Sequence, residues 1–151
     1  MNPPSIPVCV WMEKRAVASR WISHEWSAAA VSLADDPVEH PAWVRHPGHV
    51  LSLYPDEAEG YYLNTSTGDP KVFVMWRQVE EEGGDALPRT VTLSYNEAAR
   101  LMDAQEKVDA VPMEPGIRAW LEAYVAENYK PEPKKKRARN SFLTPDERSK
   151  L

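Results

Sequence analysis

The hydrophobic pattern changes its period once along the chain, near Ser94, and this change limits the fold class. Before Ser94, apolar residues mostly alternate with other residues, as they do in strands whose side chains point to opposite faces of a sheet. After it, they recur at helical spacing. Strands followed by helices, instead of the two in alternation, indicate an α+β fold with an antiparallel sheet.

Six segments are predicted to form strands, namely 6–14, 21–33, 50–54, 60–64, 71–79 and 90–93. In the first, Val8, Val10 and Met12 share one face, and Cys9 and Trp11 share the other. A helix over the alanine run is an alternative for 21–33, whereas 71–79 is apolar on both faces and indicates a central strand. Residues 34–48 and 80–87 are predicted loops because of their prolines, glycines and acids. We expect a sheet of about six strands, or a half-open barrel.

Two helices are predicted after the strands, with a short extended segment, 108–113, between them. Ser94 and Glu97 have the spacing of a capping box, which predicts a helix over 95–105 that buries Ala98, Leu101 and Met102. Pro115 suits the first turn of the second helix, which should end near Tyr129. Its amphipathic stripe comprises Ile117, Trp120, Leu121, Tyr124 and Val125. The two helices are expected to close the sheet.

Composition divides the chain at Tyr129. Residues 1–129 are predicted to form a single α+β domain, and they hold 10 basic and 20 acidic residues. Residues 130–151 hold 8 basic and 3 acidic residues with several prolines, and a disordered basic tail is predicted there. An acidic domain repels phosphates, so nucleic acid is an unlikely partner. The tail is expected to steer encounters with an acidic partner.

Residues that could carry chemistry do not fall into a catalytic pattern. His24, His40, His46 and His49 lack the spacing of metal ligands, so no metal site or other cofactor is expected. Cys9 is the only cysteine, which excludes an intramolecular disulfide, and we interpret it as a small buried residue. The chain also lacks a glycine-rich phosphate loop and a nucleophile elbow. We therefore expect a protein that is not an enzyme.

The start of the chain does not have the pattern of a signal peptide, and no apolar stretch approaches the roughly 20 residues that cross a bilayer. We therefore expect a cytoplasmic protein that does not bind membranes. Surplus tryptophan suggests a docking surface for another protein, because interface centres favour Trp and Arg. The residues proposed for it are Trp11, Arg15, Arg20, Trp21, Trp26 and Trp43, with Lys134, Lys135, Lys136, Arg137 and Arg139 of the tail.

Two stretches resemble a known family. The first contains Ile6-Pro7-Val8, Met12-Glu13-Lys14-Arg15, Ser19-Arg20-Trp21 and Glu25-Trp26; the second contains Leu93-Ser94-Tyr95-Asn96-Glu97-Ala98, Val111-Pro112-Met113 and Ile117-Arg118-Ala119-Trp120. They resemble a proteobacterial domain of unknown function that is usually encoded beside molybdenum-dependent formate dehydrogenase genes. The resemblance covers residues 6–129 and carries no catalytic residues.

That resemblance implies a non-enzymatic accessory protein that matures, stabilises or docks a formate dehydrogenase. Its expected partner is a subunit of that enzyme or one of its maturation factors. Three alternatives stay open: a permanent small subunit of the complex, a nucleic-acid-binding regulator that uses the basic tail, and a small-ligand binder that uses the barrel interior.

Overall fold

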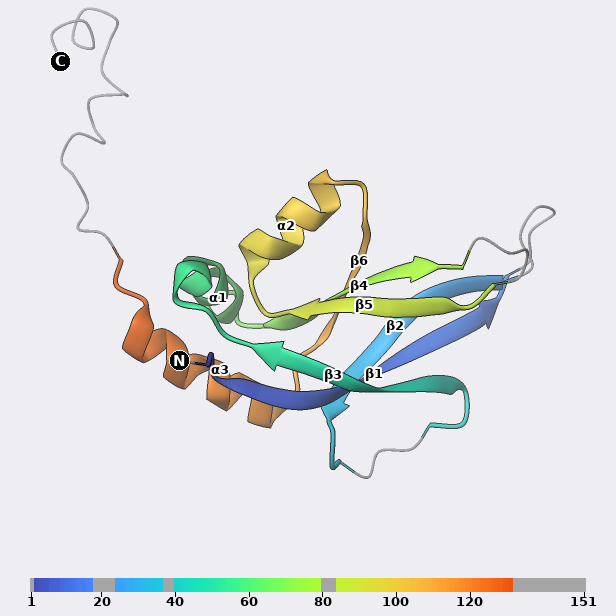
Figure 1. Ribbon diagram of the computed structural model, residues 1–151, viewed down its shortest axis with the longest axis horizontal. Coiled ribbons are helices and arrows are strands. Elements are labelled where there is room, and N and C mark those ends of the chain that lie inside the picture. Colours follow the sequence, from blue (N-terminus) through green and yellow to red (C-terminus); the bar gives the residue numbers. More distant parts are fainter. Residues whose placement is uncertain (1, 18–23, 37–39, 80–83, 132–151) are drawn as a thin grey trace, which may run out of the picture.

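The computed structural model shows two three-stranded antiparallel sheets with helices gathered toward one end of the molecule (Figure 1). It describes residues 2–17, 24–36, 40–79 and 84–131. The predicted α+β fold is confirmed, and the strands are antiparallel as expected. Within the described residues, however, the six strands are divided between two sheets.

The first sheet has the strand order β2-β1-β3. It consists of β1 (Ser5–Ala16), β2 (His24–Leu33) and β3 (Trp43–Ser52). The central strand β1 buries Val8, Val10 and Met12 on its inner face, toward the second sheet. Cys9 and Trp11 lie on the opposite, outer face, as the alternation predicts.

The second sheet has the strand order β5-β4-β6. It consists of β4 (Lys71–Gln78), β5 (Ala86–Thr92) and β6 (Lys107–Pro112). The central place predicted for 71–79 is confirmed, since every residue from Val72 to Trp76 is buried. The edges of the two sheets lie together, β2 beside β6 and β3 beside β5. The pair of sheets therefore encloses its interior like a half-open barrel.

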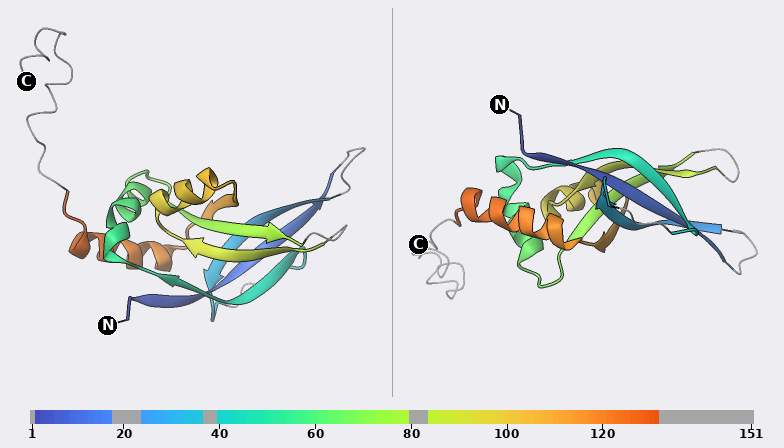
Figure 2. Two further views of the ribbon diagram at one scale, coloured as in Figure 1. Left: turned by 45° about the horizontal axis from the view of Figure 1, so that its top comes forward. Right: turned by 90° about the horizontal axis from the view of Figure 1, so that it is seen from below.

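One end of this interior is covered by α1 (Ala58–Thr65), which follows the short 3-10 helix η1 (Pro55–Glu57), and by α3 (Pro115–Asn128). The third helix, α2 (Tyr95–Asp103), lies on the outer face of the second sheet, where Tyr95 packs edge-on against Phe73 of β4. The hairpin ends of β1 and β2 and of β4 and β5 project the other way (Figures 1 and 2). The expected cap of α2 is present, with Glu97 N–H donating to Ser94 Oγ at 3.0 Å. The backbone N–H of Ser94 donates to the hydroxyl of Thr92 at 3.1 Å.

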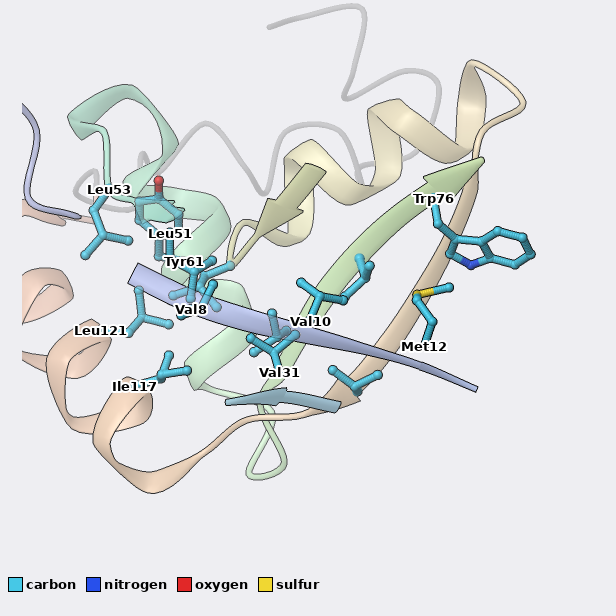
Figure 3. Packing of buried hydrophobic residues seen from close by; sticks show 14 of the residues in the cluster. Val8, Val10, Met12, Val31, Leu51, Leu53, Tyr61, Trp76, Ile117 and Leu121 are labelled. Atoms are coloured by element: carbon cyan, nitrogen blue, oxygen red, sulfur yellow. The ribbon is translucent and has the colours of Figure 1, made fainter. Parts of the chain in front are cut away.

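The core joins both sheets to α1 and α3 (Figure 3). Ile117 and Leu121 of α3 point toward Val8, and Tyr61 of α1 lies next to Leu51. The predicted stripe of α3 is thus confirmed, with Trp120, Tyr124 and Val125 packed at the margin of the core. These side chains fill the space between the sheets. No helix among the described residues is long and apolar enough to cross a membrane.

Two strands, β3 and β5, contain a proline and extend into segments that were predicted as loops. Residues 43–48, predicted as loop, belong to β3, and residues 86 and 87, also predicted as loop, belong to β5. Both are edge strands, in which a proline can sit without removing a ladder hydrogen bond. Pro47 lies at a shift in the β1–β3 register beside Gly48, whose φ of +88° suits glycine. Pro88 lies at the register shift opposite Trp76.

Three further predictions are wrong. Segment 60–64 is helical, in α1, although its tyrosines favour strands. The alternation expected of a strand does not hold through 21–33, because a bulge opposite Trp11 and Met12 turns Trp26 and Ala28 to the inner face together with Val31. Met102 is 50% exposed, since α2 covers the barrel with one narrow stripe around Ala98.

Candidate docking surface

The outer face of the first sheet carries a cluster of aromatic and basic side chains. In the β1–β3 register, Trp11 lies opposite Arg45, and Glu13 lies opposite Trp43. Residues that lie opposite each other in antiparallel strands share a face. Trp11, Trp43 and Arg45 therefore lie together on the side that faces away from the second sheet.

Trp11 forms the floor of this cluster. Its side chain is only 4% exposed although it lies on the outer face. The indole Nε1 donates to Ser32 Oγ of β2 at 2.9 Å, so its polar atom is satisfied. The ring of Trp43 covers it, with the ring centroids 6.4 Å apart and the planes at 56°. The floor is therefore fixed in one position.

A tight turn before β3 forms the wall. Trp43 N–H donates to the carbonyl of His40 at 3.1 Å, and Ala42 N–H donates to His40 Nδ1 at 3.2 Å. The His40 ring stacks on Trp43 with the centroids 3.9 Å apart and the planes 8° from parallel. A pocket of about 300 Å³ is left between Trp11, His40, Pro41 and Arg45. We call it the outer aromatic pocket.

Arg45 supplies the charge at the rim of the outer aromatic pocket. Its side chain is exposed and forms no ion pair with any described residue. A guanidinium beside aromatic rings can bind a carboxylate through charge-assisted hydrogen bonds, while the rings accept an apolar side chain. The pocket is thus suited to a protein segment in which an acidic residue neighbours an apolar one.

Cys9 lies on the same face two residues from Trp11 and is not part of this chemistry. It is 1% exposed, as predicted for a small buried residue. Burial raises the pKa of its thiol, and the nearby Arg45 charge offsets this only in part. A buried thiol with a raised pKa is a poor nucleophile.

The structure brings together three of the six domain residues proposed for docking. Trp11 lines the pocket, Trp43 contacts the rings of both Trp11 and His40, and Arg15 lies farther along the same face, where it pairs with Glu25 at 3.5 Å. Trp26 is buried on the inner face with the Lys14 ammonium 5.6 Å from its ring centroid, so it belongs to the core. The remaining proposed residues, Arg20, Trp21, Lys134, Lys135, Lys136, Arg137 and Arg139, lie outside the described residues.

Sequence reasoning missed Arg45, His40 and Pro41. All three fall within 34–48, which the prolines marked as loop, so no side-chain alternation was assigned there. The spacing of Trp43 and Arg45, two residues apart, was the available signal. It would have placed them on one face of a strand.

His46 and His49 lie on the inner side of β3, opposite Val10 and Val8. Burial lowers the pKa of both side chains. His46 Nε2 is buried without a hydrogen-bond partner among the described residues. Within the same part of the chain, no group of three or more His, Cys, Asp or Glu side chains is arranged to hold a metal ion.

A second hollow, of about 330 Å³, lies at the hairpin end of the barrel. Its lining includes Trp26, Trp76 and Lys107, and the Lys107 ammonium lies 4.9 Å from the Trp76 ring centroid. Its charges are mixed, because Glu25 also lines it. This mixture does not select one class of ligand.

Residues 7–138, most of the chain, match the model of a family described as a protein of unknown function (DUF3305). The match begins at the third residue of β1, includes every later helix and strand through α3, and extends nine residues past Tyr129. No curated protein and no solved structure shows significant similarity to the chain.

Proposed function

The chain belongs to the DUF3305 family of proteins of unknown function, and we propose that it is a non-enzymatic accessory protein of a molybdenum-dependent formate dehydrogenase. In this proposal it works in the cytoplasm, where it docks on a subunit of that enzyme or on one of its maturation factors. Docking would support maturation, stabilisation or attachment of the enzyme.

One observation carries the docking role, namely the outer aromatic pocket. It combines a buried Trp floor, a wall held by the His40 turn, and the unpaired cation of Arg45. Trp and Arg are the residues most enriched at the energetic centre of protein interfaces. Because the wall is already hydrogen-bonded, little side-chain freedom remains to be lost on binding.

The identity of the partner rests on the resemblance described for residues 6–129. The resemblance is the reason to name formate dehydrogenase as the partner. The pocket supports only the kind of side chains that a partner would place in it. The partner surface is expected to present an acidic side chain beside an apolar one. The basic residues after Tyr129 would add a longer-range attraction to such a surface.

The proposal can be tested by affinity capture with the tagged full chain from its own host grown on formate. We expect the catalytic subunit of formate dehydrogenase, or a maturation factor, to be enriched. Arg45→Glu should lower its recovery at least tenfold, because the rim charge is reversed. Arg89→Glu is the matched control, since Arg89 is another exposed arginine on an edge strand, and it should leave recovery unchanged.

Two results would contradict this function. One is a capture in which the native chain enriches no dehydrogenase component. The other is equal recovery with Arg45→Glu and with the native chain. Stoichiometry separates the two forms of the proposal: a fixed ratio through purification indicates a permanent small subunit, and a variable, growth-dependent ratio indicates an accessory protein.

A further inference from the structure

Charge is divided between the strands and the helices of this molecule. The six strands contain seven Lys or Arg residues and three Asp or Glu residues. In η1 and the three α-helices the balance is reversed, with two Lys or Arg residues and seven Asp or Glu residues. The helices lie toward one end (Figures 1 and 2), and α3 ends there at Asn128. The basic C-terminal segment therefore begins at the end where these acidic helices lie, which we call the acidic end.

A groove of about 570 Å³ lies at the same end, and we call it the terminal groove. Prolines and tyrosines form most of its lining, and Tyr54 is 47% exposed. The lining residues are Asn2, Pro3, Pro4, Leu53, Tyr54, Pro55, Tyr124, Glu127 and Asn128.

Two acidic residues at this groove form no ion pair with any described residue. Glu127 lines it, and Asp56 follows Pro55 near Tyr124, where its charge adds to burial in raising the pKa of the Tyr124 phenol. The terminal groove thus pairs an apolar, aromatic lining with unbalanced negative charge.

This combination fits an extended segment that is rich in proline and basic residues. Such segments make no internal hydrogen bonds and dock on aromatic-lined grooves, where an acidic rim can pair with their Lys or Arg residues. The chain itself contains a segment of this kind. Pro131 and Pro133 precede Lys134, Lys135, Lys136, Arg137 and Arg139, and Phe142 and Leu143 follow.

We propose that the terminal groove binds the C-terminal segment of its own chain, residues 132–143. The rise per residue places Tyr124 and Asn128 about 6 Å apart along α3, and eight extended residues span up to about 26 Å. Tyr129 stacks on Tyr62 of α1, with centroids 4.4 Å apart and planes at 14°, so the segment starts from a fixed point. A segment tethered this closely has an effective concentration on the order of mM.

This contact goes beyond the docking role and does not depend on it. The basic residues are held by the acidic end of their own molecule until another acidic surface competes for them. The segment is then released only near such a surface. This limits the attraction of its basic residues to unrelated acidic molecules.

A spin label in the full-length chain tests the proposal. Ser141→Cys provides the attachment point, because Cys9 is buried in the folded protein. Paramagnetic broadening should reduce the amide signals of Leu53 and Tyr54 at least twofold, and tenfold dilution should not change the effect. Because the tether starts at the margin of the groove, a label on an unbound segment would also broaden these signals, so the comparison with charge variants decides whether the segment binds.

Charge variants show whether the C-terminal segment binds in the terminal groove. Asp56→Lys/Glu127→Lys should reduce the broadening, and adding Lys134→Glu/Lys135→Glu/Lys136→Glu to it should restore the effect. Asp103→Lys is the matched control, since Asp103 is an exposed acid on α2 away from the groove lining, and it should retain the broadening. If the double variant does not fold, the three tail substitutions alone should reduce the effect.

Three results would overturn the proposal. Broadening that persists in Asp56→Lys/Glu127→Lys would show that these two carboxylates do not hold the segment in the groove. Broadening that disappears on dilution would place the segment on a second copy of the chain. Equal loss in Asp103→Lys would indicate general attraction to the acidic end without use of the groove.

Discussion

Gly60 is the residue at which α1 comes closest to the start of α2. A Cβ atom there would lie 2.1 Å from Ser94 Oγ. Ser94 cannot move aside, because its hydroxyl donates to Glu57 Oε1 at 2.6 Å and accepts from Glu97 N–H at 3.0 Å. Its side chain is also fully buried. The absence of a side chain at position 60 therefore sets the distance between the two helices.

We accordingly expect Gly60→Ala to lower the free energy of unfolding by about 1–3 kcal/mol, as overpacking does, despite the better helix propensity of alanine. Gly116→Ala is the control, because its new Cβ would meet mainly the carboxylate at the end of the Glu114 side chain, at 3.0 Å. That carboxylate caps α3 through Gly116 N–H and Ile117 N–H, and a shift of a few tenths of an ångström relieves the contact. That variant should stay within about 1 kcal/mol of the native chain. Urea unfolding measures both, and equal effects would contradict the steric explanation.

At the scale of the elements, a single carboxylate joins the two sheets along the β2–β6 edge. Asp109 Oδ2 of β6 accepts from the backbone N–H of Ala28 in β2 at 2.9 Å. The same oxygen accepts from Trp76 Nε1 in β4 at 2.8 Å. Trp76 is buried, so the bond satisfies a polar atom that water cannot reach easily.

Asp109→Ala should lower the free energy of unfolding by about 2–6 kcal/mol, because it leaves two donors without an acceptor, at about 1–3 kcal/mol each. Asp109→Asn should cost less than half as much, since its amide oxygen can still accept both bonds. Urea unfolding of the two variants provides the comparison. If they were equally destabilised, the carboxylate would matter for its charge and not as a shared acceptor.

Some of the helices and strands could be predicted from the sequence, and others could not. The β1 faces, the β4 position and the α3 stripe followed from side-chain periodicity, because burial on one face imposes that periodicity. α1 did not, because its helix depends on distant partners: Asn64 Nδ2 donates to the carbonyls of Lys71 and Leu93 at 2.7 and 2.9 Å. At the outer aromatic pocket, the sequence singled out Trp11 and its neighbour Trp43, whereas Arg45 was missed with the start of β3, and a docking role for these residues stays a prediction.

For the whole molecule, the two half-buried histidines of β3, His46 and His49, link stability to pH. Burial lowers the pKa of His46 and of His49 from the ordinary value of 6.5, so below about pH 6.5 the unfolded chain binds protons that the folded chain does not. The free energy of unfolding should therefore decrease as the pH falls from 7.5 to 5.5. Asp85, which favours the charged form of His46, opposes only part of this effect.

Urea unfolding at the two pH values checks this expectation. His46→Gln/His49→Gln, which is neutral at both, should lose less stability between them than the native chain does. If the double variant loses as much free energy of unfolding between pH 7.5 and pH 5.5 as the native chain does, the acid sensitivity comes from carboxylates elsewhere.

The exposed charge of Arg45 at the rim of the outer aromatic pocket also acts on an acidic partner before the two proteins touch. This attraction favours encounters in which the pocket faces that partner. Encounters would then begin already oriented, so the association rate should fall steeply with added salt while the dissociation rate changes little. Stopped-flow mixing with such a partner at several salt concentrations would measure this alignment.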